Sequence, residues 1–260
     1  MSVEALHAYL ARPLQDAPPE LLAQIDRGPI DPRDALALGD LDRLLDPTPL
    51  GRETGWCTLP DGVGYVAVRT AMPRVTGAMV DWWFDWHPRD SLRYRAWHPY
   101  AHLANSIEPP RTPREKAHWG AVHHPVEDVG FGVVHARIEF CAPTELGFMG
   151  DALDDPRVAA IACGYAGDDR LRMRHTAMVH VWLRDGEGTV LRSRFWLGAA
   201  LRPYGPLGAF GERALNRPAV RRRAIPSRAP TALARHCAEE YANLGAVLPE
   251  LYGRFGTNTA

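Results

Sequence analysis

A histidine and a glutamate one helical turn apart near the C-terminus are the best candidates for chemistry in this 260-residue chain. Apolar residues recur at helical spacing from about Pro230 to Leu248, which predicts a long helix that ends at Pro249. At roughly 100° per residue, Glu240 falls at the edge of the apolar stripe and His236 lies beside it. A carboxylate on a buried face is costly unless it is paired or binds a metal. Because residues i and i+4 share one helix face, the two side chains could hold one divalent ion together.

The pair also has a simpler interpretation, and any further ligands must come from elsewhere. An ordinary hydrogen bond at the helix margin, or an arginine partner from the sheet, would account for it equally well. In a predicted strand over residues 129–141, alternation places His135, Arg137 and Glu139 on one face. That face is solvated in an open sheet, whereas it lines a cavity in a sheet that wraps around a helix. His180, on a later strand, is by itself more typical of a hydrogen-bonded core histidine.

A dense block of aromatic and imidazole side chains lies between residues 82 and 102. It contains four tryptophans, two tyrosines and three histidines, more than core packing alone requires. Rings with polar tips suit a pocket for a flat, hydroxylated ligand. A protein interface or an anchor for a loop is the alternative.

The elements that must position these residues can be read from the pattern of apolar residues. The first sixty residues contain short helical patterns interrupted by prolines, which predicts a small helical N-terminal segment (1–60) ahead of a main domain (61–260). β-branched and aromatic residues predict strands in four places. The predicted helices span 3–10, 19–25 and 32–45, and the predicted strands span 62–72, 129–141, 172–184 and 190–201. Strands followed by one long helix indicate an α+β fold in which a curved antiparallel sheet surrounds the C-terminal helix.

Composition limits the class of protein. Lys plus Arg number 30 and Asp plus Glu number 31, and this balance disfavours nucleic acid as the main partner. The four cysteines form no C-x-x-C pair, which argues against a zinc ribbon, a redox motif or a disulfide framework. With neither a signal-like N-terminus nor an apolar run of about 18 residues, we expect a cytoplasmic protein without membrane segments.

Several of these segments, taken in order, resemble the 2,4-diacetylphloroglucinol hydrolase family, which includes phloretin hydrolase. The resemblance rests on the segments 80–87, 93–102, 191–196 and 236–252. It implies a helix-grip (Bet v1-like) domain with a large cavity, and an N-terminal part used in forming a homodimer. It also implies a zinc ion (Zn²⁺) held by two histidines and two glutamates. Matched to this chain, the ligands are His102, Glu139, His236 and Glu240, with His98 an alternative to His102.

The family resemblance further implies the reaction and the residues that bind the substrate. Tyr94, Asn105 and His180 match polar pocket residues that hold a phenolic ketone, and His180 is a candidate for passing a proton. The implied reaction is hydrolysis of the carbon–carbon bond between a phloroglucinol-type ring and an acyl group. The family's late-strand tyrosine has no clear counterpart here, because Phe195 lies in that region and Tyr204 is the nearest hydroxyl. A carrier of an aromatic natural product, or a zinc enzyme catalysing another biosynthetic reaction, therefore remains an alternative.

Overall fold

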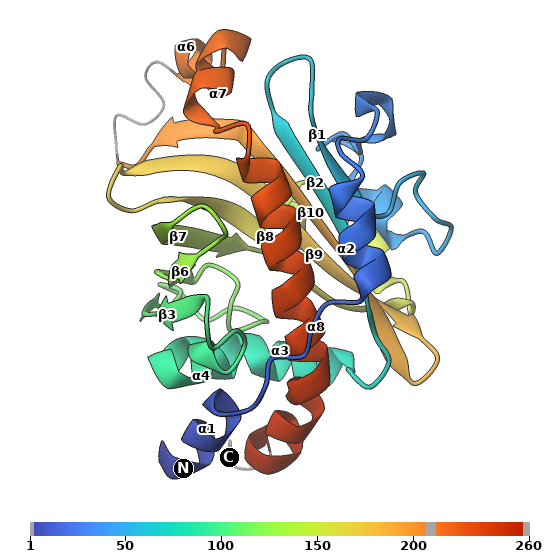
Figure 1. The fold of residues 1–260 in the computed structure, drawn as a ribbon, viewed down its shortest axis with the longest axis vertical. Helices are drawn as coiled ribbons and strands as arrows, with labels where there is room; N and C mark the ends of the chain where they lie inside the picture. The colour runs from blue at the N-terminus through green and yellow to red at the C-terminus, as the bar shows by residue number, and fades with distance from the viewer. Residues whose placement is uncertain (1–2, 206–211, 257–260) are drawn as a thin grey trace.

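The computed structural model describes residues 3–205 and 212–256, and its centre is a curved antiparallel sheet that holds a long C-terminal helix, α8 (Ala229–Phe255) (Figure 1). This arrangement confirms the α+β, helix-grip prediction. The strand order is β1-β2-β10-β9-β8-β7-β5-β4, and β6 joins β3 to β7. The longer strands are β2 (Gly64–Met72), β7 (Val133–Cys141), β8 (Val158–Asp168), β9 (Met173–Asp185) and β10 (Gly188–Pro203). Sequence analysis predicted four of these five and missed β8.

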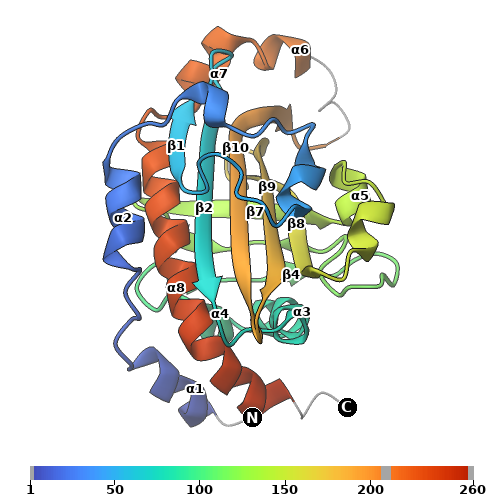
Figure 2. The same cartoon turned by 90° about the vertical axis from the view of Figure 1, so that its right-hand side faces the viewer.

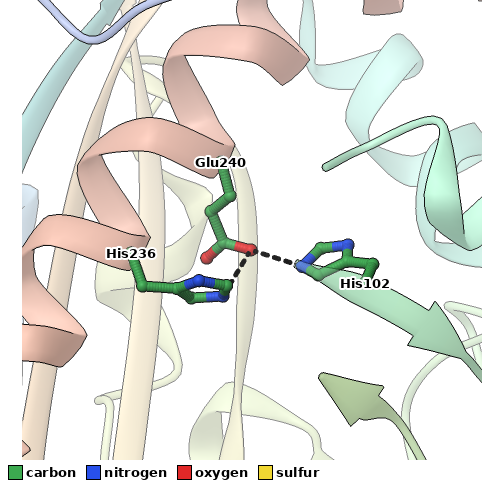
Figure 3. Close-up of side chains that lie close together, drawn as sticks. All are labelled: His102, His236 and Glu240. Atoms are coloured by element: carbon green, nitrogen blue, oxygen red, sulfur yellow. Dashed lines mark ion pairs between the residues drawn. The ribbon is translucent and has the colours of Figure 1, made fainter. Parts of the chain in front are cut away.

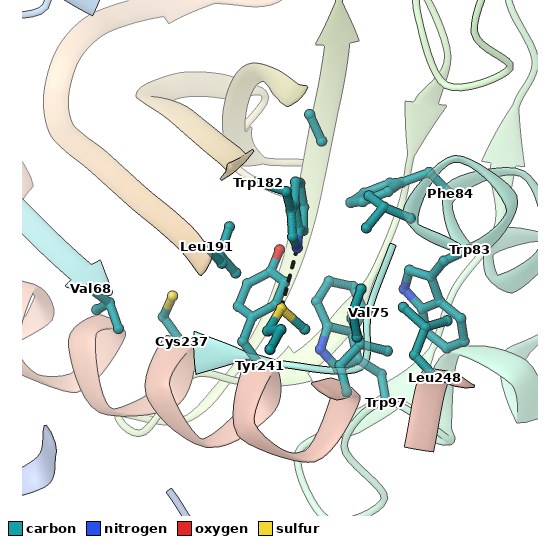
Figure 4. Packing of buried hydrophobic residues seen from close by; sticks show 14 of the residues in the cluster. Val68, Val75, Trp83, Phe84, Trp97, Trp182, Leu191, Cys237, Tyr241 and Leu248 are labelled. Carbon is teal, nitrogen blue, oxygen red and sulfur yellow. Dashed lines mark hydrogen bonds between the residues drawn. The ribbon is translucent and has the colours of Figure 1, made fainter. Parts of the chain in front are cut away.

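Both faces of the central strands are buried. On β9, Met178 and Trp182 belong to the core that packs against α8, while Val179 and Val181 belong to a second core on the opposite face. The first core continues through the aromatic rings of the 82–97 block (Figure 4). Much of that block therefore serves core packing, and only part of it is available to a pocket.

The C-terminal helix does not end at Pro249 as the sequence predicted. Proline removes one backbone hydrogen bond, but the helix continues to Phe255 with Pro249 inside it. The last turns are held by tertiary packing, since Leu251 is fully buried and the ring of Phe255 stacks on Trp86 with centroids 5.5 Å apart. Burial of these side chains outweighs the local cost of the proline.

The N-terminal segment packs along the helix and over the outer face of the sheet (Figures 1 and 2). α1 (Val3–Leu10) and α2 (Pro19–Asp26) match the predicted short helices. The third predicted helix is instead two 3₁₀ turns, η1 (Pro32–Asp34) and η2 (Leu41–Leu45), and η2 covers the second core. β1 (Gly55–Thr58) pairs with β2, so the sheet begins before the predicted boundary at residue 61. Homodimer formation through this segment stays a prediction.

Short elements occupy the region between β2 and β7. They are α3 (Gly77–Trp86), η3 (His87–Arg89), α4 (Ser91–Arg95), β3 (His102–Ala104), β4 (Ile107–Glu108), β5 (Val122–His123) and β6 (Val126–Asp128). The remaining helices are α5 (Pro143–Leu146), η4 (Asp151–Asp154), α6 (Glu212–Leu215) and α7 (Pro218–Ala224). Within the described ranges, none of the helices combines the length and the apolar character needed to cross a membrane.

Candidate metal centre

Three of the four ligands expected from the sequence lie together in the interior. His236 and Glu240 project from α8 toward His102 on β3 (Figure 3). Glu240 Oε2 lies 3.4 Å from His102 Nε2 and 3.7 Å from His236 Nε2. All three residues are buried. The i,i+4 spacing thus places one imidazole and one carboxylate beside the histidine of a strand that is distant in sequence.

A fourth side chain, Glu127 on β6, completes the group. Its Oε2 lies 3.4 Å from His102 Nε2 and 4.0 Å from His236 Nε2. β3 and β6 are antiparallel, and His102 is directly opposite Glu127 in the register. Directly opposite residues of an antiparallel pair place their side chains on the same face. The group is therefore two histidines and two glutamates.

His102, His236 and Glu240 lie close enough together to hold one metal ion, because their ligand atoms are all within 4.8 Å of one another. Ligand atoms about 2.0–2.1 Å from zinc lie roughly 3.4 Å from each other in a tetrahedron, and the four histidine–glutamate separations above run from 3.4 to 4.0 Å. Glu127 lies within this range of both histidines, which makes it the candidate for a fourth ligand. His102 Nε2 is buried and has no hydrogen-bond partner. No lysine or arginine of residues 3–205 and 212–256 forms a salt bridge with Glu127 or Glu240. A cation would satisfy all of these groups at once.

The protonation states agree with a ligand role for the histidines. Burial lowers the pKa of His102 well below its usual value and that of His236 to about 4, so both imidazoles are neutral at pH 7. Burial, together with the nearby Glu127 carboxylate, raises the pKa of Glu240 well above its ordinary range. Burial also raises the pKa of Glu127. The neutral imidazoles leave a lone pair available to a metal ion, and a bound cation would favour the ionised form of the two carboxyl groups.

Tyr94, on α4, orients two of the four side chains. His102 Nδ1 lies 3.2 Å from the carbonyl oxygen of Tyr94, to which it donates, leaving the lone pair on Nε2 for a metal. The two rings stack in parallel with centroids 4.1 Å apart. The Tyr94 hydroxyl donates a hydrogen bond to Glu127 Oε2. Tyr94 therefore acts on the ligands themselves, which its predicted role in substrate binding did not include.

Glu139, the fourth ligand expected from the sequence, does not join the group. Its carboxylate lies 3.2 Å from Arg137 Nε, as part of an ion-pair network. On β7 it is the apolar residues Val134, Ala136, Ile138 and Phe140 that line the cavity. Because side chains alternate along a strand, the face that carries Glu139 points away from the cavity.

The hairpin between β6 and β7 explains why Glu127 takes this place. Gly130 and Gly132 have φ of +89° and +116° and form its turn, and the resulting register sets Glu127 opposite Val134. Both of these side chains line the cavity. The glycines were the one signal in the sequence that could have identified Glu127, since β6 is too short to show alternation.

His98, the alternative to His102, lies on the outer side of His236. Its ring stacks on His236 with centroids 5.8 Å apart, and its Nε2 is 3.9 Å from Glu239. It belongs to a second, more open pocket that also contacts His236. Of the two candidates on this segment, His102 is the one that faces Glu240.

A cavity of about 670 Å³ adjoins the four residues, and Glu127, His236 and Glu240 contribute to its wall. Tyr94, Asn105 and His180, the predicted pocket residues, also line it. The side-chain amide of Asn105 is buried, and neither its nitrogen nor its oxygen has a hydrogen-bond partner. An unpaired buried amide is costly, so Asn105 is suited to bind a ligand hydroxyl as both donor and acceptor.

His180 is held as a neutral imidazole deep in the same cavity. Its Nδ1 lies 2.9 Å from Ser193 Oγ, and burial lowers its pKa to about 3. The ring of Phe195 lies 5.3 Å away, also in the cavity wall. Tyr204 does not line the cavity; its ring lies under the guanidinium of Arg137. Phe195 therefore lies beside His180 in the region where the family resemblance implies a tyrosine.

His123 is a cavity residue that sequence analysis passed over. It is buried on β5, lines the cavity, and its Nε2 has no hydrogen-bond partner. Phe140 and His87 hold its ring by edge contacts, with centroids 4.7 Å and 5.7 Å away. With Asn105, it provides a second unpaired polar group for a ligand.

Comparisons with known proteins agree with this geometry. Residues 36–253 match the family model described as DAPG hydrolase PhiG domain, and the chain belongs to this family. Among its relatives, phloretin hydrolase of Eubacterium ramulus is 30% identical over 258 residues, which cover 95% of this chain and 88% of that protein. The 2,4-diacetylphloroglucinol hydrolase of Pseudomonas protegens is 30% identical over 263 residues, which cover 94% of this chain and 82% of that protein. The prediction of an enzyme, a hydrolase that acts on carbon–carbon bonds, is confirmed with the family.

Proposed function

We propose that this protein is a zinc-dependent hydrolase that cleaves the bond between a phloroglucinol-type ring and its acyl carbon. The observation that carries the proposal is the convergence of His102, Glu127, His236 and Glu240 beside a cavity that also exposes unpaired polar groups. The names of the two relatives support the substrate class. The products are the deacylated phenol and a carboxylic acid.

A zinc ion held by these four residues would polarise the acyl carbonyl and lower the pKa of the attacking water. The remaining work falls to the protein's own side chains. The Tyr94 hydroxyl already donates a hydrogen bond to Glu127. The Tyr94 oxygen can therefore accept a hydrogen bond from a ring hydroxyl of the substrate. Asn105 and His123 supply unpaired groups for another hydroxyl or for the carbonyl. Donation from the Asn105 amide N–H to a ring oxygen would favour the keto tautomer that cleavage requires.

Hydrolysis adds the hydroxyl of water to the acyl carbon and a proton to the ring carbon. The ring leaves with the electron pair of the broken bond, so a proton donor must face that carbon. His180 lines the cavity as a neutral imidazole, and its Nδ1 bond to Ser193 Oγ fixes the ring orientation. We assign His180 two roles, which are to position the substrate ring and to relay the proton to its ring carbon.

Metal analysis of paired variants tests the proposal. We expect about one zinc per chain in the wild type and in Glu139→Gln, and loss of zinc in Glu127→Gln, measured by elemental mass spectrometry. Hydrolysis of monoacetylphloroglucinol, followed by chromatography of phloroglucinol and acetate, should follow the metal content. If Glu139→Gln lost zinc and Glu127→Gln retained it, the ligand assignment would be wrong. A wild type that hydrolyses the ketone without any metal would refute the zinc-dependent reaction.

A further inference from the structure

The cavity extends well beyond the four residues of the metal centre, and its far part differs in character. Ala229, Leu233, His236 and Glu240 all line it from one face of α8. Eleven residues separate the first from the last, which corresponds to about 16 Å along a helix. The cavity therefore runs along α8 from the metal centre toward the helix N-terminus, where α7 lies (Figure 1).

The side of this extension formed by β10, α7 and α8 is apolar, while Thr176 of β9 lies opposite Leu197. We call this side the apolar arm, and its residues come from β10, from the end of α7 and from the first turns of α8. They are Phe195, Leu197, Leu201, Ile225, Ala229 and Leu233. Gly198 allows Ile225 to pack closely against β10, because its φ is +87° and a Cβ there would lie only 3.2 Å from Ile225 Cγ1. The side chain of Ile225 thus packs over the end of β10.

Polar groups at the β8–β9 side of the cavity have partners within the chain. The Asp168 carboxylate accepts a hydrogen bond from the backbone N–H of Leu171 at 2.7 Å. His175 Nδ1 lies 2.7 Å from Thr176 Oγ1. Buried cavity residues without a hydrogen-bond partner are instead found around the candidate metal centre, and they are Trp97, Asn105 and His123. The polar end is suited to a hydroxylated ring, and the arm is suited to a part of the ligand without hydrogen-bonding groups.

On this basis we infer that the substrate carries a long alkyl chain on its acyl group, and that the apolar arm binds this chain. The inference rests on the proposed function, which places the acyl carbonyl at the metal centre. A ring bound by Tyr94, Asn105 and His123 leaves the acyl group directed along α8. An acetyl group would leave the arm unfilled, whereas an unbranched chain of six to eight carbons would extend along it. The six side chains of the arm offer no hydrogen-bond partner to a polar chain terminus, which favours an unsubstituted alkyl chain.

A series of monoacylphloroglucinols tests the chain length. With acetyl, butanoyl, hexanoyl and octanoyl substrates, we expect kcat/KM to rise by about two- to fourfold per methylene, the factor expected for burial of one CH₂. An ω-hydroxyoctanoyl substrate should lose most of this gain, because its hydroxyl is buried without a partner. Equal kcat/KM across the series, or a preference for acetyl, would overturn the inference and leave the proposed hydrolase intact.

A matched pair of variants locates the effect. Ile225→Asn places an amide in the arm, while Val220→Asn makes a similar change on α7 at a side chain that is 36% exposed and does not line the cavity. We expect the octanoyl-to-acetyl ratio of kcat/KM to fall at least about tenfold in Ile225→Asn and to stay at the wild-type value in Val220→Asn. An unchanged ratio in Ile225→Asn would place the chain elsewhere.

A binding measurement separates the two proposals and does not depend on a folded variant. Alkylphloroglucinols, in which a methylene replaces the carbonyl, cannot be hydrolysed at this bond. Their Kd for the wild-type protein, followed by calorimetry, should decrease about two- to fourfold per methylene. If this holds while no acyl substrate is hydrolysed, the arm is supported and the hydrolase proposal fails. If Kd is independent of chain length, the arm is not a chain site.

Discussion

Glu53, on the outer face of the sheet, and the two glutamates of the candidate metal centre have opposite electrostatic surroundings. Glu53 lies under the outer face of the sheet, 2.7 Å from Arg192 Nη2 and 2.9 Å from Arg194 Nη2. Burial alone would raise its pKa, but the hydrogen bond from the Leu50 N–H and the two arginines outweigh burial and lower it. Glu127 and Glu240 face two neutral imidazoles, and their pKa values are raised. Glu53 has its cationic partners within the chain, while Glu127 and Glu240 have no arginine or lysine partner among the described residues.

The largest effect on stability should come from removing the Glu53 carboxylate from its ion pairs with Arg192 and Arg194. Glu53→Gln leaves Arg192 and Arg194, both nearly fully buried, without a carboxylate partner. Removing one member of a buried ion pair costs about 3–5 kcal/mol. We expect the free energy of unfolding in urea to fall by that amount while zinc per chain stays at the wild-type value. A loss of zinc from the folded variant would show that Glu53 and the candidate metal centre are coupled.

Acid should destabilise the protein through buried histidines before it affects Glu53. Burial lowers the pKa of His87 to about 3 and that of His118 to about 4, whereas unfolded histidine titrates near 6.5. Between these values the unfolded state binds more protons, so stability is complete above about pH 6.5 and falls as pH decreases toward 4. We expect a loss of a few kcal/mol over this window, measured by urea unfolding with metal chelated throughout. Stability that is constant from pH 7 to 4 would contradict it.

Tyr94→Phe should weaken the metal centre without removing a ligand. The substitution deletes the hydroxyl that donates to Glu127 and keeps the ring that stacks on His102. Loss of such a supporting hydrogen bond typically costs 10–100-fold in metal affinity. Zinc competition against a chromogenic chelator measures it, with Tyr100→Phe, an exposed tyrosine, as the matched control. Equal zinc affinities in the two variants would show that the Tyr94 hydroxyl does not support metal binding.

The smallest expected effect is an increase in the stability of the metal-free protein. Glu240→Gln removes a carboxyl group whose pKa is raised by burial and by Glu127, and which therefore opposes folding at pH 7 when no metal is bound. In the metal-free protein we expect the free energy of unfolding to rise by about 1 kcal/mol. With zinc added, the wild type should be the more stable of the two, because only it gains binding free energy. A metal-free variant less stable than the wild type would show that Glu240 is satisfied without a cation.

Spacing along the sequence was sufficient to predict the candidate site residues that lie on one helix. His236 and Glu240 are one turn apart on α8, and the helical period alone places them on one face. The aromatic pattern and the family resemblance led to His102, Tyr94, Asn105 and His180, all of which line or adjoin the cavity. The curved sheet and its long helix followed from apolar periodicity.

Only the tertiary structure decides which glutamate is the candidate for a fourth ligand. Both Glu127 and Glu139 lie on strands that contact the same region, and alternation within β7 does not say which face turns inward. The β6–β7 hairpin and the pairing of β3 with β6 set that choice, because strand register depends on partners that are distant in sequence. Helix-period spacing is local, so the amino-acid sequence directly determined that His236 and Glu240 share one face of α8. Strand pairing is non-local, so the fold determined which glutamate faces them.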